Sequence, residues 1–147
     1  MNIDICTKNR VRSILLGLGL SLMTLPALAH DHYYEQFGGK PGIKAMVNSF
    51  IGYVLADHRI SSYFARTDIP ALKAALTDQF CQEEGGPCKY DGASMSQVHQ
   101  SLGVTEGAFN ALVADLIRGM DHRHIPLAAQ NNLLSKLAPM ESQIVTR

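Results

Sequence analysis

The sequence contains no tryptophan, few cysteines and no net charge, since 13 lysines and arginines balance 13 aspartates and glutamates. Its most apolar stretch, residues 13–25, is shorter than the roughly 20 residues that a membrane-spanning helix needs. No segment alternates apolar and polar residues as a half-buried strand does, and no repeat or low-complexity block is visible. Together with the chain length, these absences predict a single all-α domain.

The first 29 residues have the composition of a secretory signal peptide. Three basic residues precede the apolar stretch, and a small-residue cleavage site ends at Ala29. We therefore expect a mature domain of residues 30–147, periplasmic or secreted, with no stable membrane insertion; an uncleaved anchor helix is the alternative. Cleavage removes three basic residues and one acidic residue, so the mature chain has a net charge of −2, which argues against nucleic acid as a partner.

Two cysteines, Cys81 and Cys88, remain after cleavage and flank a Gly-Gly-Pro turn. In an oxidising compartment we expect a disulfide between them. Two free thiols or a metal-binding pair are the alternatives. Zinc is disfavoured because no second pair of cysteines or histidines stands at the usual spacing.

Apolar spacing predicts about five helices joined by short connections. The first runs from Gly42 to Asp57, and the second from an Asp68 cap to about Glu83. A long helix follows a cap at Thr105, and the last helix begins at Pro126. The residues expected to face the core in these four helices are Ile43, Met46, Val47, Phe50, Ile51, Val54 and Leu55; Leu72, Leu76 and Phe80; Phe109, Leu112, Val113, Leu116, Ile117 and Met120; and Leu127, Leu133, Leu134, Leu137 and Met140.

A short helix between Ser94 and Gly103 carries His99. Ser94 and Gln97 have the spacing of a capping box, in which each side chain bonds the other's backbone N–H. His99 shares the apolar face of this helix with Met95, Val98 and Leu102. A buried imidazole needs partners for both nitrogens, so His99 is either a core histidine bonded to a carbonyl group or a metal ligand.

Motifs for catalysis are absent from the sequence. There is no G-x-S-x-G, P-loop or H-E-x-x-H element, and no reduced cysteine is expected beside a histidine. What remains is His99 facing an apolar groove walled by the Phe50 helix, Phe64 and the Leu72–Phe80 face. Zinc requires more protein ligands, whereas haem iron, already held by four porphyrin nitrogens, needs one histidine and an apolar pocket.

Several motifs between Tyr34 and Met140 together resemble the group I truncated haemoglobins, which are shortened globins with a two-over-two helical sandwich. The matching elements are YEQFGG at 34–39 with Gly42-Ile43, Phe50 with VLAD at 54–57, Tyr63-Phe64, Leu72-Lys73, Phe80, GGP at 85–87, Tyr90 with Gly92, and Met95 with Val98-His99. The order and spacing of these elements are more specific than any one of them alone.

This resemblance implies that the protein binds haem b, with His99 as the proximal iron ligand and Phe64 packed on the haem. We assign thirteen residues to the haem pocket: Phe50, Ile51, Phe64, Leu72, Lys73, Leu76, Phe80, Tyr90, Met95, His99, Val104, Phe109 and Val113. The implied ligand is a diatomic gas, O2, NO or CO.

The sequence departs from the family on the distal side of the pocket. Many members carry a tyrosine and a glutamine there that hydrogen-bond O2, whereas the aligned positions here are Ile51 and Leu76, with Leu72 at the distal gate. A charge-assisted hydrogen bond is worth about 1.5–3 kcal/mol. We therefore expect an apolar pocket that holds O2 weakly, unless Gln79 or Tyr53 turns into it.

The leading functional prediction is an exported haem protein that reversibly binds diatomic gas. The resemblance also implies NO dioxygenation, in which O2 and NO give nitrate, but this chain carries no reductase module and its electron donor is unknown. A redox or sensory haem protein that exchanges electrons with an exported partner is a second class. Peroxidase chemistry is disfavoured because no distal acid–base residue is evident, and a haem-free helical interaction domain is the remaining alternative.

Overall fold

The computed structural model describes residues 33–147, so the predicted signal peptide and its cleavage site lie outside the described residues. The described part is helical throughout and contains no strand, which confirms the all-α prediction for these residues. The elements are α1 (Tyr33–Gln36), α2 (Gly39–Ala56), the 3₁₀ helix η1 (Ser61–Phe64), α3 (Ile69–Glu83), α4 (Met95–His99), α5 (Glu106–His122), α6 (Leu127–Leu137), the 3₁₀ helix η2 (Ala138–Met140) and α7 (Glu141–Ile144).

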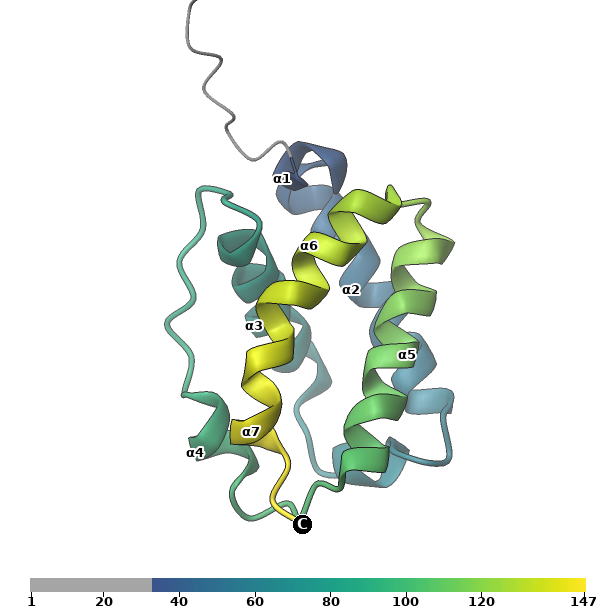
Figure 1. Ribbon diagram of the computed structural model, residues 1–147, viewed down its shortest axis with the longest axis vertical. Coiled ribbons are helices and arrows are strands. Elements are labelled where there is room, and N and C mark those ends of the chain that lie inside the picture. The colour runs from purple at the N-terminus through teal and green to yellow at the C-terminus, as the bar shows by residue number, and fades with distance from the viewer. Residues whose placement is uncertain (1–32) are drawn as a thin grey trace, which may run out of the picture.

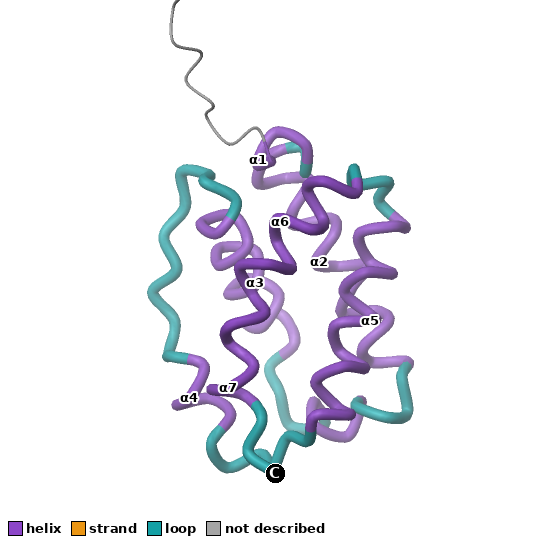
Figure 2. The backbone as a smooth tube through the Cα atoms, viewed as in Figure 1, coloured by secondary structure: helices purple, strands orange, loops and turns teal. Residues whose placement is uncertain are grey.

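Helix α2 is the centre of the packing and makes its most extensive contacts with α5 and α3. Figure 1 shows α6 and α7 crossing in front, between α5 on one side and α3 with α4 on the other. The long connection from α3 to α4 runs along the outer edge of the molecule (Figure 2). The short helix α4 contacts α7. This arrangement leaves an interior space bounded by α2, α3, α4 and α5.

The core confirms most of the predicted apolar faces. Helix α2 buries six side chains, and α5 and α6 close over them from the other side. The fully or almost fully buried apolar residues of these three helices are Ile43, Met46, Val47, Phe50, Ile51, Val54, Ala111, Leu116, Met120, Ala129 and Leu133. Two predicted core residues are instead exposed: Leu55 by 44 % and Leu127 by 69 %. Each lies at a helix end, where the neighbouring helix no longer covers the predicted face.

Local capping fixes where three helices begin. The Asp68 carboxylate accepts a hydrogen bond from the backbone N–H of Ala71, and the Thr105 hydroxyl accepts one from Ala108. Ser94 forms the predicted capping box at the start of α4. These contacts satisfy N–H groups that have no partner within the helix.

The structure corrects two helix ends. Helix α4 stops at His99 rather than continuing to residue 103, and the last predicted helix is broken after Leu137 into η2 and α7. Pro139 lies in η2, where its missing N–H interrupts the α-helical hydrogen bonds. The extra turn, α7, returns the chain toward α4, where Thr146 and Arg147 donate backbone hydrogen bonds to the carbonyl of Val104.

The predicted pair Cys81 and Cys88 forms a disulfide in the structure, with an S–S distance of 1.94 Å. Cys81 is buried at the end of α3, and Cys88 lies in the connection to α4. The bridge therefore ties α3 to the loop that leads to His99. Within residues 33–147, no helix combines the length and the apolar character needed to cross a bilayer.

Candidate functional site

A cavity of about 510 Å³ lies between α2, η1 and α3 on one side and α4 and α5 on the other. Its volume is within the usual range for small-molecule and cofactor pockets. Ten of the thirteen residues predicted to form the haem pocket line it: Phe50, Ile51, Phe64, Leu72, Leu76, Tyr90, Met95, His99, Val104 and Phe109. Segments from residue 50 to residue 109 thus converge on one space, although their role as haem contacts stays a prediction.

Three predicted pocket residues do not line the cavity: Lys73, Phe80 and Val113. Each follows the helical periodicity but lies on a neighbouring face. Lys73 is one position beyond Leu72, about 100° round the helix. Phe80 is 3 % exposed and belongs to the hydrophobic core instead of the cavity wall. On α5 it is Leu112, and not Val113, that reaches the cavity.

The structure adds wall residues that were not assigned to the haem pocket from the sequence, among them Ile60, Tyr63, Ala75, Leu102, Leu112 and Ile144, and it places Gln79, named there only as a residue that could turn inward, in the wall. Helical spacing was a usable signal for Gln79, because it lies three residues beyond Leu76 on the same face of α3. No local signal identified Ile144. It reaches the cavity only because η2 and α7 turn the chain back toward α4.

One ring nitrogen of His99 is fixed by a hydrogen bond within its own helix. Its Nδ1–H donates a hydrogen bond of 2.8 Å to the carbonyl oxygen of Met95, one turn earlier in α4. A carbonyl can only accept, so Nδ1 carries the proton and the lone pair of Nε2 stays available. Such a contact from the second nitrogen orients ligating histidines in metal sites. The bond to a carbonyl group expected of a core histidine is therefore present, and the role of Nε2 as a metal ligand stays a prediction.

The apolar surface beside His99 is uncovered. Val98 is 45 % exposed and Leu102 is 43 % exposed, and both line the cavity. Two half-exposed aliphatic side chains flanking an imidazole fit a flat apolar group that would cover them. Within residues 33–147, no three histidine, cysteine, aspartate or glutamate side chains come together as they do around a bare metal ion. A metal that brings its own equatorial ligands, as haem iron does, fits this single-histidine site.

The wall facing α4 is mainly hydrocarbon but not wholly so. Ile51 from α2 and Leu72 and Leu76 from α3 line it, and none of these three side chains carries a hydroxyl or an amide. Gln79 also lines it and is 6 % exposed. The expectation of an apolar wall thus needs correction at one position.

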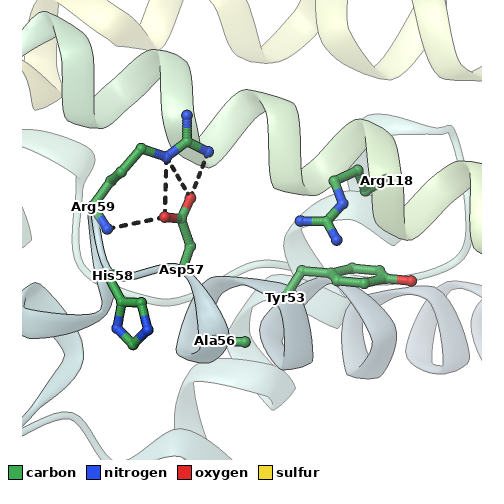
Figure 3. Close-up of a pocket in the computed structure, with 6 residues that line it drawn as sticks. All are labelled: Tyr53, Ala56, Asp57, His58, Arg59 and Arg118. Carbon is green, nitrogen blue, oxygen red and sulfur yellow. Dashed lines mark hydrogen bonds and ion pairs between the residues drawn. The ribbon is translucent and has the colours of Figure 1, made fainter.

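Tyr53 does not enter this cavity. It lines a separate, open hollow of about 470 Å³ at the end of α2, together with Arg59 and Arg118. Figure 3 shows the Arg118 guanidinium above the Tyr53 ring, and the distance to the ring centroid is 4.2 Å. The Arg59 guanidinium donates two hydrogen bonds to Oδ2 of Asp57. Tyr53 is therefore held at the surface by a cation–π contact and is no donor for the cavity.

Two carboxyl groups behind this hollow have opposite pKa shifts. The side-chain hydrogen bonds from Arg59, followed by its backbone N–H, lower the pKa of Asp57 to about 2. Burial raises the pKa of Asp115, and the nearby Asp57 charge raises it further, against the pull of Arg118. Asp115 lies on α5 and is fully buried. The hollow is therefore a structural charge cluster joining two helices.

Comparison with known proteins identifies the family of this chain. Residues 32–146 match the model of the bacterial-like globin family. The group 1 truncated haemoglobin of Mycolicibacterium paratuberculosis is 32 % identical over 113 residues, covering 77 % of this chain and 83 % of that protein. The corresponding protein of Synechocystis is 31 % identical over 97 residues, covering 63 % and 78 %.

Solved structures give the same result for the fold. The Fe(III) form of truncated haemoglobin from Tetrahymena pyriformis superposes with a TM-score of 0.74 and 26 % identity, covering 78 % of this chain and 98 % of that one. The 2/2 haemoglobin of Synechococcus, in the cyanomet state with covalently attached haem, superposes with a TM-score of 0.72 and 25 % identity over the same shares. The two-over-two helical fold is thus shown, and the chain belongs to the bacterial-like globin family as a group 1 truncated haemoglobin.

Proposed function

We propose that the protein binds haem b through Nε2 of His99 and reversibly holds a diatomic gas on the opposite side of the iron. The observation that carries this proposal is the fixed tautomer of His99 at the wall of a 510 Å³ cavity. When bound, haem iron supplies a coordination position for O2, NO or CO. His99 would hold the iron, and the apolar side chains of the cavity wall would exclude water from it.

Each wall of the cavity has a distinct role in this proposal. Phe64, on η1, and Phe50, on α2, provide aromatic surface for the porphyrin. Ile51 and Leu76 face the gas side, and because neither side chain carries a polar hydrogen, they favour small apolar molecules over water. This part of the wall gives bound O2 no hydrogen bond, whereas CO and NO depend less on one.

The absorption spectrum of the purified protein in the ferric, ferrous and CO-bound forms tests the proposal. We expect a Soret band that shifts on CO binding. The His99→Ala variant should lose stable haem, and imidazole added to the buffer should restore the band if the variant is folded. The exposed His58, replaced by alanine, is the matched control and should keep haem. A purified wild-type protein that takes up no haem contradicts the proposal, and a low-spin spectrum without added gas would indicate an electron-exchanging protein instead.

We also propose that the chain is exported and cleaved after Ala29. The support is the arrangement of basic, apolar and small residues in the first 29 positions. The mass of the protein from the periplasm of a bacterial host measures this directly. We expect a species that begins at His30 and whose mass is lower by two hydrogen atoms because of the Cys81–Cys88 bridge. An uncut chain in the membrane fraction would refute cleavage.

A further inference from the structure

Gln79 is a buried amide at the wall of the haem cavity with almost nothing to bond. Its side chain is 6 % exposed and lines the cavity from α3. Among residues 33–147, its one hydrogen bond runs from Nε2–H to the sulfur of Met140, at 3.5 Å. A thioether is a weak acceptor. Burying an amide without good partners is unfavourable, so this contact alone does not explain why an amide stands here.

The other polar groups of the cavity wall are already engaged. The Tyr63 hydroxyl donates to the carbonyl of Gly103, at 3.4 Å, and the Tyr90 hydroxyl donates to the carbonyl of Ala93, at 2.9 Å. The Nδ1–H of His99 is bonded to Met95, and Asp68 caps α3 at an exposed position. Thr67 is likewise exposed. Gln79 is therefore the buried polar side chain of this wall that retains donor capacity.

Its position on α3 suits a contact with the gas. Leu72, Leu76 and Gln79 lie at i, i+4 and i+7 and so share one face of the helix. Gln79 lies one turn beyond Leu76, and both side chains line the cavity.

We propose that Gln79 is the hydrogen-bond donor that selects the ligand in this cavity, favouring O2 over CO, and that Met140 holds its amide at rest. The inference rests on the proposed haem and gas function. Bound O2 carries partial negative charge and is a better acceptor than a thioether, so the amide moves from sulfur to ligand at small cost. Bound CO gains much less from the same donor.

The Gln79→Met variant tests the proposal, because methionine keeps the length and unbranched shape of glutamine without its hydrogens. We expect O2 to dissociate about 10- to 100-fold faster, as loss of a charge-assisted hydrogen bond implies. CO should dissociate less than about threefold faster. The C–O stretching band of the CO complex should shift to higher frequency, because a donor near the CO oxygen has been removed.

A second variant separates donation from packing. In Met140→Leu the competing acceptor is gone, so O2 should dissociate more slowly than in the wild type and the C–O band should shift to lower frequency. If Met140→Leu accelerates O2 loss as Gln79→Met does, both residues act only by packing and the proposal is overturned. Equal changes in O2 and CO dissociation in Gln79→Met, or none, also overturn it. In each of these cases an intact Soret band shows that the haem function itself stands, whereas its absence in the wild type refutes that function.

Discussion

Residue 51 determines whether α2 can donate a hydrogen bond to a bound gas under the proposed function. Ile51 is 1 % exposed and lines the cavity, so a hydroxyl placed there would lie inside the pocket. We expect Ile51→Tyr to slow O2 dissociation by about 10- to 100-fold through a charge-assisted hydrogen bond. Stopped-flow displacement of O2 by CO measures the rate. Ile51→Phe adds the same ring without the hydroxyl and should not slow the rate, so an equal effect of both variants would mean that volume alone is responsible.

The charge cluster beside Tyr53 predicts a pH dependence of stability. Arg59 lowers the pKa of Asp57 from its usual 3.8 to about 2. Asp57 therefore stabilises the fold above pH 3.8, and this contribution is lost as the pH falls toward 2. In urea unfolding between pH 2 and 7, Asp57→Asn should be less stable than the wild type at neutral pH, with a difference that shrinks below pH 4.

Asp115 provides the opposite case. Burial raises its pKa, so its contribution is complete below pH 3.8 and declines as the pH rises. Asp115→Asn should therefore gain stability relative to the wild type as the pH rises above 4. If both variants follow the wild-type pH profile, the two carboxyl groups are not coupled to folding.

Residue roles were predictable from the sequence only where a local pattern specified them. His99 was singled out from its place on an apolar helix face and from the resemblance, and the structure places it at the cavity wall, while its role as iron ligand stays a prediction. Lys73 was assigned by motif position, but its face of α3 lies beside the cavity wall. Gln79 was named only as a residue that could turn into the pocket. A polar side chain is not expected in an apolar wall, and its burial is known only from the structure.

At the scale of elements, α2 and α5 cross where Gly119 meets Phe50. A Cβ atom at Gly119 would lie 2.9 Å from Cα of Phe50, which is backbone and cannot turn aside. We expect Gly119→Ala to lower the free energy of unfolding by about 1–3 kcal/mol, since overpacking exceeds the gain in helix propensity. Urea denaturation measures this.

The matched control for this helix crossing is Gly52→Ala. Gly52 is an exposed position of α2 with nothing within 4 Å of its added Cβ. It should raise the free energy of unfolding by about 0.5–1 kcal/mol. If both variants stabilise the protein equally, then the close approach of α2 and α5 is not a constraint on packing.

Helix starts were predictable because caps are local. Asp68, Ser94 and Thr105 each bond a backbone N–H a few residues ahead, so a short sequence contains the whole signal. Helix ends depended in part on distant contacts. The break after Leu137 has a local cause in Pro139, whereas the return of α7 toward α4 depends on tertiary packing, which no short segment specifies.

On the scale of the whole molecule, the two walls of the haem cavity differ in how they are supported. Helices α3 and α5 each pack extensively on α2, whereas the five-residue α4 contacts chiefly α7. Half-exposed Val98 and Leu102 line the cavity on the α4 side. Short helices with few buried contacts open at low free energy. Under the proposed function, haem completes the packing of the α4 wall more than that of the others.

Haem removal should therefore loosen the molecule unevenly. We expect amide hydrogens of residues 95–103 to exchange at least about tenfold faster in the apoprotein than in the haem-bound protein, equivalent to 1.4 kcal/mol of lost protection. Amides at the centres of α2 and α5 should change less, because their packing does not involve the cofactor. Hydrogen–deuterium exchange with mass spectrometry resolves the two regions, and haemin added to the His99→Ala variant should restore no protection. Uniform loosening of all helices would mean that haem holds the whole fold together and not one wall of it.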